Sequence, residues 1–203
     1  MSSMSRNKAI AVFLAFAFAY FLSALIRAIT ATIAPTLVAE FQLQSADLGL
    51  LAGGYFLGFA AMQLPLGKWL DSHGPRKVEL LFLAAALAGC LAFSQADGFV
   101  GLLFARILCG IGVCACLMAA LTGYRRWFAP EQLMRANSWM LMVGAFGMVA
   151  STLPVQWLLP VIGWRGIFLV LAALMLISMA LIAWQVPPWE APATPAGATP
   201  QAQ

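Results

Sequence analysis

Two arginines stand inside long apolar runs of the sequence, where a charge is expensive. Arg27 and Arg106 are each flanked mainly by Ala, Ile, Leu or Phe. On insertion scales, an arginine at the centre of a membrane helix costs about 2.5–3.5 kcal/mol, so such a residue faces a partner or a water-filled cavity. A planar guanidinium holds a carboxylate, nitrate or phosphate through paired hydrogen bonds. These two residues are therefore the first candidates for chemistry in this chain.

Polar side chains accompany Arg27 on one face of the same predicted helix. Offsets of seven, four and three residues lead to Tyr20, Ser23 and Thr30, and such spacing places polar groups near one face. The group contains no acid, so it suits an anionic solute, and we predict substrate contact for Arg27. A structural or gating role and a side chain that reaches the lipid headgroups are the alternatives. Gln63 is a further cavity-lining candidate, with a helix kink as its alternative.

Other kinds of chemistry find little support in the residues. Cys90, Cys109, Cys114 and Cys116 lie within apolar runs without metal-ligand spacing, and His73 is the single histidine, so we predict no metal site. The sequence holds no nucleotide-binding loop, catalytic triad or zinc-protease motif. We therefore predict that the chain is not an enzyme and uses no cofactor. No predicted span carries an Asp or Glu at mid-depth, which leaves a carboxylate proton relay without an obvious place.

The composition indicates which elements hold these residues. Apolar residues make up 63% of the 203 residues and charged residues 9%, with a mean hydropathy of +0.92. A soluble domain has roughly 45–50% apolar and about 25% charged residues. We predict an all-α integral membrane protein, surrounded by the lipid bilayer, with spans of about 20 residues each. The six predicted transmembrane helices are 9–34, 47–66, 78–96, 99–123, 137–159 and 166–185.

Basic residues are unevenly divided between the connecting segments. Of the eleven, two lie within helices, and with a cytoplasmic N-terminus eight lie inside and only Arg165 outside. The inside set is Arg6, Lys8, Lys68, Arg76, Lys77, Arg125, Arg126 and Arg135. This bias predicts that both termini are cytoplasmic, at the inner membrane of a bacterium. Because these residues sit in short loops, we predict no nucleic-acid partner.

The chain divides into three predicted parts. A short cytoplasmic segment, 1–8, precedes the transmembrane domain at 9–186. The remaining residues, 187–203, are rich in Pro, Ala and Thr and have no periodicity. Such a composition cannot support a packed core, so we predict a disordered cytoplasmic tail or linker.

The loop after the second predicted helix carries the most specific pattern. Gly67, Asp71, Gly74, Arg76 and Lys77 follow one another within eleven residues. The glycines suit a tight reversal between two spans. Asp71 is an acid in a place that favours bases, so we predict that it accepts hydrogen bonds from a helix N-terminus or an arginine. A solvated turn with an incidental acid is the alternative.

This loop resembles the signature of the major facilitator superfamily of secondary transporters, Gly-x-x-x-Asp-Arg-x-Gly-Arg-Arg/Lys between the second and third helices. Ser72 stands where the family usually has a base, and Pro75 displaces the basic pair by one position. The family pattern Arg-x-x-x-Gly-x-Gly of the fourth helix is matched by Arg106, Gly110 and Gly112. Residues 163–165, Gly-Trp-Arg, are similar to the family's external loop, and the resemblance covers about residues 8–186.

The resemblance implies an N-terminal half of such a transporter, with six helices in a 3+3 inverted repeat. A second six-helix half would complete the substrate site. Together with Arg27, this predicts a secondary active transporter of a small anionic organic solute that works by alternating access. The second half belongs to the same gene, to a separate chain or to a second copy of this one. The alternative is a truncated or non-transporting half that is inactive alone or acts as a regulatory or assembly subunit.

The resemblance also assigns a gate to the loop after the second helix. In the family, the aspartate that matches Asp71 helps to hold the two halves together in the outward-open state. Arg76 and Arg106 are then expected in or near the same charge network. Arg106, Gly110 and Gly112 are accordingly predicted to have structural or coupling roles, with the two glycines permitting close helix contact.

Overall fold

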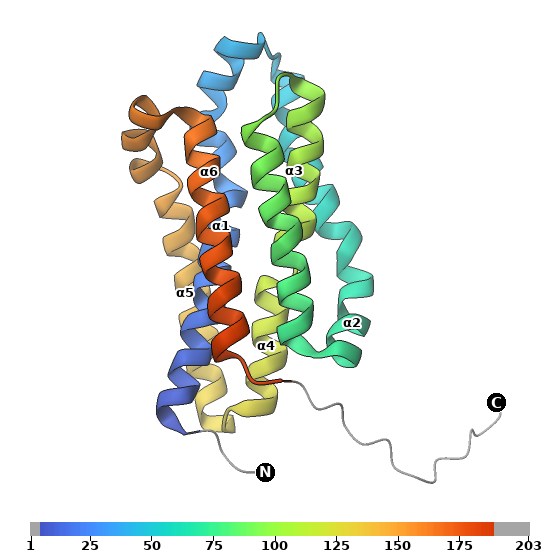
Figure 1. Cartoon of the computed structure of the whole chain (residues 1–203), viewed down its shortest axis with the longest axis vertical. Coiled ribbons are helices and arrows are strands. Elements are labelled where there is room, and N and C mark those ends of the chain that lie inside the picture. Colours follow the sequence, from blue (N-terminus) through green and yellow to red (C-terminus); the bar gives the residue numbers. More distant parts are fainter. Residues whose placement is uncertain (1–4, 189–203) are drawn as a thin grey trace, which may run out of the picture.

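The computed structural model describes residues 5–188, which form a bundle of long helices (Figure 1). No strand occurs among these residues, so the predicted all-α class is confirmed. Most of the predicted tail, from residue 189 onward, lies outside the described residues. The helices are α1 (Arg6–Phe41), α2 (Ser45–Ser94), α3 (Phe99–Val113), α4 (Ala115–Trp127), α5 (Pro130–Ala150) and α6 (Leu153–Gln185).

Glycines with positive φ interrupt two of these helices. At Gly74 the backbone has φ 77° and ψ 163°, a conformation that glycine adopts without steric cost. Helix α2 reverses direction there (Figure 1), so that 45–73 and 75–94 are two legs of one element. The predicted reversal after the second span is therefore confirmed. Gly163, with φ 68°, likewise separates a short piece of α6 from the long stretch 164–185.

The fifth predicted span, 137–159, is displaced in the structure. Helix α5 begins seven residues earlier, at Pro130, and ends at Ala150. Proline favours the first turn because its fixed φ suits a helix and its missing N–H has no partner there. Pro154 starts α6 in the same way. The hydropathy pattern predicts a single span across this boundary because the residues on both sides of it are mostly apolar.

Other predicted ends are closer to the observed ones. Helix α1 begins at Arg6, within the predicted segment 1–8, and continues past the predicted 9–34 to Phe41. The predicted span 99–123 consists of α3 and α4, which meet at Cys114 and end at Trp127.

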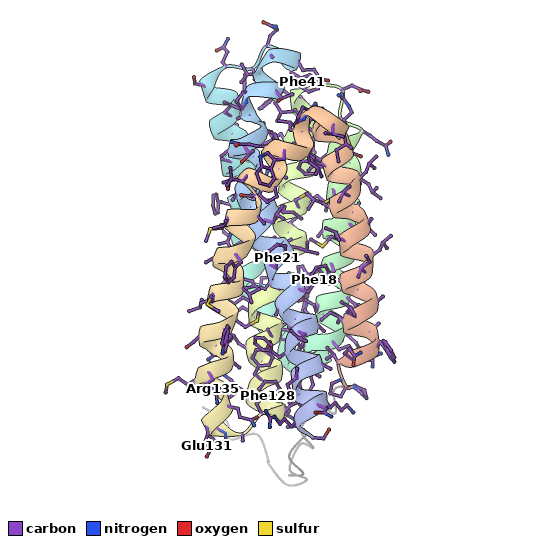
Figure 2. All side chains as sticks on the ribbon, turned by 90° about the vertical axis from the view of Figure 1, so that its left-hand side faces the viewer. Phe18, Phe21, Phe41, Phe128, Glu131 and Arg135 are labelled. Carbon is purple, nitrogen blue, oxygen red and sulfur yellow. The ribbon has the colours of Figure 1, made fainter. Side chains whose placement is uncertain are left out.

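Much of the outer surface of the bundle is apolar. Leu64 is 88% exposed, Trp184 82% and Met134 79%, and Figure 2 shows side chains projecting along the whole length of the helices. Exposed apolar surface of this extent is expected where lipid replaces water. The helical stretches long and apolar enough to cross a bilayer are Arg6–Phe41, Ser45–Ser94, Phe99–Trp127 and Leu153–Gln185.

The connections between helices are divided between the two ends of the bundle (Figure 1). The start of α1, the Gly74 turn, the α4–α5 connection and the end of α6 lie at one end. The α1–α2, α2–α3 and α5–α6 connections lie at the other. In Figure 2, Arg135, Phe128 and Glu131 mark the first end and Phe41 the second. Segments that the sequence predicts to lie on the same side of the membrane therefore lie at the same end of the bundle.

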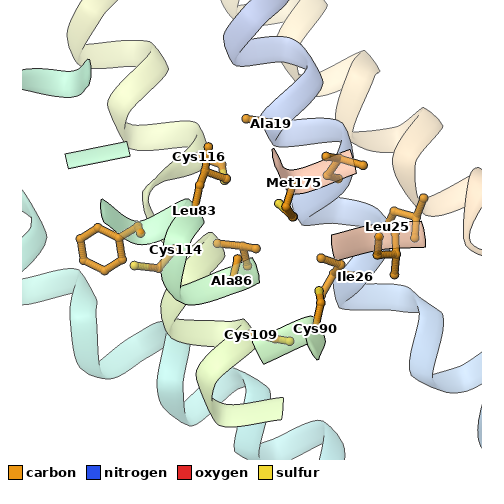
Figure 3. Close-up of a cluster of buried hydrophobic side chains, with 14 of the residues drawn as sticks. Ala19, Leu25, Ile26, Leu83, Ala86, Cys90, Cys109, Cys114, Cys116 and Met175 are labelled. Atoms are coloured by element: carbon orange, nitrogen blue, oxygen red, sulfur yellow. The ribbon is translucent and has the colours of Figure 1, made fainter. Parts of the chain in front are cut away.

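Helix α3 packs between the two legs of α2 at glycine positions. A Cβ on Gly110 would lie 2.0 Å from the carbonyl oxygen of Tyr55, and one on Gly112 would lie 2.1 Å from the backbone nitrogen of Ala86. The backbones are thus in contact on both sides, as predicted for these two glycines. All four cysteines are buried and free. Figure 3 shows them among apolar side chains at the centre of the core.

Candidate solute-binding site

Arg106 connects three helices in the interior of the bundle. It lies on α3 and is 1% exposed. Its NH1 donates to the carbonyl of Ile26 over 2.9 Å, and its NH2 reaches the carbonyl of Arg27 over 3.5 Å. The guanidinium carbon lies 4.7 Å from the centre of the Tyr55 ring on α2, within the range of a cation–π contact. Arg106 is therefore held in place by α1 and α2.

Unpartnered polar atoms gather around this arginine. Arg27 is half-buried on α1, and Tyr55, which interacts electrostatically with both arginines, is 1% exposed. Thr30 is 8% exposed on the same helix as Arg27. The buried atoms without a hydrogen-bond partner include Nε of Arg27, Oγ1 of Thr30, Oη of Tyr55 and Nε of Arg106. We call these four residues the arginine cluster.

The arginine cluster has positive charge and no compensating acid. Among the residues that the structure describes, no carboxylate pairs with Arg27 or Arg106. Buried polar groups in folded proteins normally have partners, and charges inside a membrane domain normally pair with an opposite charge. Two cations with free N–H groups, next to two hydroxyls that can donate, form an arrangement that an anion would satisfy.

Two of the predicted substrate-contacting residues, Ser23 and Tyr20, contact other helices of the bundle. Ser23 is buried and its hydroxyl donates to the carbonyl of Val113, at the end of α3, over 3.4 Å. The ring of Tyr20 packs toward α5, where a Cβ on Gly144 would lie 2.6 Å from it. Gln63 is half-buried and lines a separate shallow pocket with Asp71. Of the predicted polar stripe, Arg27 and Thr30 belong with Tyr55 to the arginine cluster, and their contact with a substrate stays a prediction.

The loop at the Gly74 turn presents an exposed acid and one bound base. Asp71 is exposed and forms no ion pair or hydrogen bond through its side chain among the described residues. Arg76 donates to the carbonyl of Ala183 in the last turn of α6. Gly67 has open space at its Cβ position, and Lys77 is exposed.

Arg106 on α3 lies far from the loop at Gly74, because its contact on α2 is well above that loop. Its partner Tyr55 precedes Asp71 by 16 residues (71 − 55), or about 24 Å at 1.5 Å per helical residue. The structure therefore places Arg106 with Tyr55 and α1 instead of within a charge network around Asp71.

A clamp at the opposite end of the bundle joins α1, the α2–α3 connection and α6. Trp164 Nε1 donates to Glu40 Oε2 over 2.7 Å, and Arg165 NH1 donates to Glu40 Oε1 over 2.5 Å. Arg165 NH2 also donates to the carbonyl of Ala96 over 3.1 Å. The positive φ at Gly163 turns the chain immediately before these two side chains. The Gly-Trp-Arg segment singled out in the sequence thus fastens one end of the bundle.

Glu79 is a buried acid that the sequence analysis missed. It is 0% exposed, and neither carboxylate oxygen has a hydrogen-bond partner. As the second residue of the predicted span 78–96, it was not counted among acids at mid-depth. Helical periodicity supplies the missing signal, because Glu79 shares its face with the buried residues Phe82, Leu83 and Ala86.

Comparisons with known proteins point to one family. The Major Facilitator Superfamily profile matches residues 16–202. The nitrate/nitrite transporter NrtP of Picosynechococcus sp. is 32% identical over 138 residues, which cover 66% of this chain and 25% of that protein. The hexuronate transporter of Escherichia coli (strain K12) is 25% identical over 153 residues, which cover 75% of this chain and 35% of that protein.

A solved structure has the same fold. It is the crystal structure of a bacterial homologue of the human lysosomal transporter Spinster, in an inward-facing and unoccupied conformation. The TM-score is 0.77 at 23% sequence identity, and the match covers 97% of this chain and 47% of that one. The chain therefore spans about half the length of the solved transporter and a smaller part of the two relatives.

Proposed function

Since the chain belongs to the Major Facilitator Superfamily, we propose that it forms one half of a secondary active transporter for a small anionic organic solute. The observation that carries this proposal is the arginine cluster, in which two buried or half-buried cations have no acid among the described residues. The names of two relatives support a negatively charged solute, since nitrate, nitrite and hexuronate are all anions, and hexuronate is an organic one.

The two arginines have different parts in the proposed site. Arg106 is fixed by its bonds to α1 carbonyls and by the Tyr55 ring, so it supplies a stationary positive charge. Arg27 is half-buried and donates to no partner through Nε, so it is free to form paired hydrogen bonds with a carboxylate. The hydroxyls of Tyr55 and Thr30 can each donate one more bond. A charge-assisted hydrogen bond is worth about 1.5–3 kcal/mol.

The proposed transport unit has two six-helix halves. In this half, the six crossings are α1, the α2 legs 45–73 and 75–94, α3 with α4, α5, and 164–185 of α6. We propose that they form the 3+3 inverted repeat of the family and that a second half covers the face with exposed Gly67 and Asp71. Alternating access then exposes the arginine cluster to each side of the membrane in turn.

We propose that both termini face the cytoplasm of a bacterial cell. The eight basic residues of the predicted inside segments belong to connections at one end of the bundle, whereas Arg165 lies in the connection at the other. Accessibility of a cysteine at exposed Lys68, in a chain with its four native cysteines replaced, tests this orientation. Labelling from the periplasmic side by a membrane-impermeant maleimide would contradict it.

Uptake into proteoliposomes tests the solute class. The purified chain is reconstituted, and uptake of labelled galacturonate is compared with that of neutral galactose. Loss of one charge-assisted pair of about 1.5–3 kcal/mol predicts that Arg27→Gln lowers galacturonate uptake by roughly 10- to 150-fold. Arg135→Gln, an exposed arginine at the end of the bundle, is the matched control and should leave uptake unchanged. Measurable galacturonate uptake that is equal in wild type and Arg27→Gln would count against the proposal.

A non-transporting half is the second candidate function. It is favoured by the loop at Gly74, where exposed Asp71 forms no ion pair among the described residues and Ser72 stands where the family usually has a base. A chain that binds the anion but takes up none in proteoliposomes would support this reading. Restored uptake on co-reconstitution with a second six-helix chain would then distinguish a split transporter from a regulatory or assembly subunit.

A further inference from the structure

Glu79 lies inside the bundle, where no charged group donates to its carboxylate oxygens and the weak donor beside them is the Cys116 thiol. It is on the second leg of α2, five residues after the Gly74 turn, and is fully buried. The titratable groups that interact with it are two residues of α4 and Cys114, the residue just before α4. The thiol of Cys116 lies beside the carboxyl group, and Cys114 and Tyr124 interact with it electrostatically. Among the described residues, no arginine or lysine forms an ion pair with it.

These surroundings are incompatible with a carboxylate anion. A buried charge is tolerated when an opposite charge or several hydrogen bonds compensate for the lost water. Glu79 has neither, and the nearby thiols and phenol carry no positive charge. Protonation removes the charge and leaves a neutral acid with one O–H group. The carboxyl group therefore has to keep a proton as long as α4 remains packed against α2.

The segment opposite Glu79 passes from α3 into α4 through Cys114, whose backbone is helical, with φ −65° and ψ −26°. Helix α3 ends at Val113 and α4 begins at Ala115, with Cys114 between them. The carbonyl of Val113 accepts a bond from the side-chain hydroxyl of Ser23 on α1. Cys116 on α4 makes the contact with Glu79. Separation of α4 from the second leg of α2 would remove Cys116 from Glu79 and admit water to the carboxyl group.

We propose that Glu79 is a proton-binding site, which holds its proton while α4 is packed against α2 and exchanges it when the two helices separate at this contact. The site is distinct from the arginine cluster, which contains no acid. On the proposed transport function, which this last step presupposes, the proton is the ion coupled to solute movement. Proton binding itself requires only the contacts within this chain.

A hydrophobic carbodiimide tests proton binding without any transport. Dicyclohexylcarbodiimide enters membranes and reacts with a carboxylic acid in its neutral form. The acid proton moves to a nitrogen of the reagent, and the carboxyl oxygen forms a bond to its central carbon. No group leaves, so the adduct adds the mass of one reagent molecule. The full chain in lipid nanodiscs is treated from about pH 5 to about pH 10, and the modified residue is located by peptide mass spectrometry.

The expected product is a single adduct at Glu79. Above its titration range, the yield should fall roughly tenfold per pH unit, because the neutral fraction falls by that factor. Glu79→Gln should lose the adduct, whereas Glu131→Gln, which alters an exposed acid of α5, should retain it. The wild-type peptide map gives the result even if a variant folds poorly. No adduct at Glu79, or a yield independent of pH while the chain remains folded, would overturn the proposal. Failure of solute uptake leaves this readout unaffected.

Discussion

Replacing Gly110 by alanine tests the close packing of α3 against α2. The added Cβ would lie 2.0 Å from the carbonyl oxygen of Tyr55 and 2.9 Å from its carbonyl carbon. Both atoms belong to the backbone and cannot rotate away as a side chain does. Helix α3 and the first leg of α2 must therefore separate to accept one methyl group.

Two opposing effects determine how much Gly110→Ala changes the free energy of unfolding. Overpacking a well-packed interior costs about 1–3 kcal/mol, while alanine is favoured over glycine in a helix by about 1 kcal/mol. Gly110→Ala should therefore lower the free energy of unfolding by up to about 2 kcal/mol. Gly53 is a matched control on α2, because nothing lies within 4 Å of its Cβ position. Gly53→Ala keeps only the favourable effect and should stabilise the chain by up to about 1 kcal/mol.

The assay is thermal unfolding of both variants and the wild-type chain in one detergent. For a chain of this length, 1 kcal/mol corresponds to a shift in Tm of about 2–4 °C. The Tm of Gly110→Ala should lie about 6–12 °C below that of Gly53→Ala when both effects are full size. A Tm for Gly110→Ala equal to or above that of Gly53→Ala would refute the packing of α3 against the first leg of α2.

Two further substitutions test contacts at the ends of the bundle. Glu40→Gln weakens the bonds from Trp164 and Arg165, and should cost less than about 1 kcal/mol because the paired side chains of Glu40 and Arg165 are 36% and 40% exposed. High salt should reduce this difference in Tm, and a loss that persists at high salt would contradict it. Arg76→Ala removes the donor to the Ala183 carbonyl, a bond worth about 0.5–1.5 kcal/mol. Amide hydrogen exchange should accelerate in the last turn of α6, and unchanged exchange there would argue against this bond.

The fold class could be predicted because apolar residues dominate the chain, and apolar runs of membrane-spanning length leave few alternatives. The reversal near Gly74 was also predictable, since glycines and charges interrupt hydropathy there. The boundary between α5 and α6 was not, because two small polar residues, Ser151 and Thr152, are the whole interruption between the apolar end of α5 and the mostly apolar start of α6. Local signals, Pro130 and Pro154 in the first turns, mark these starts better than hydropathy does.

The candidate site was predictable only in part. Arg27 and Arg106 stand out because a cation in an apolar run is rare. Their meeting with Tyr55 depends on how α1, α2 and α3 pack, which periodicity within one helix does not reveal. Glu79 was missed because it stands at the start of its predicted span. The face of the helix on which it lies, which is the buried one, was not considered.

Binding of an anion to the arginine cluster is the central claim, and the Tm of the purified chain tests it most directly. A ligand at one hundred times its Kd stabilises the folded state by about 2.7 kcal/mol, or about 5–11 °C for a chain of this length. Galacturonate should raise the Tm of the wild type, and neutral galactose should not. Arg27→Gln should lose most of the rise. Equal stabilisation by galactose, or a full response in Arg27→Gln, would contradict the account.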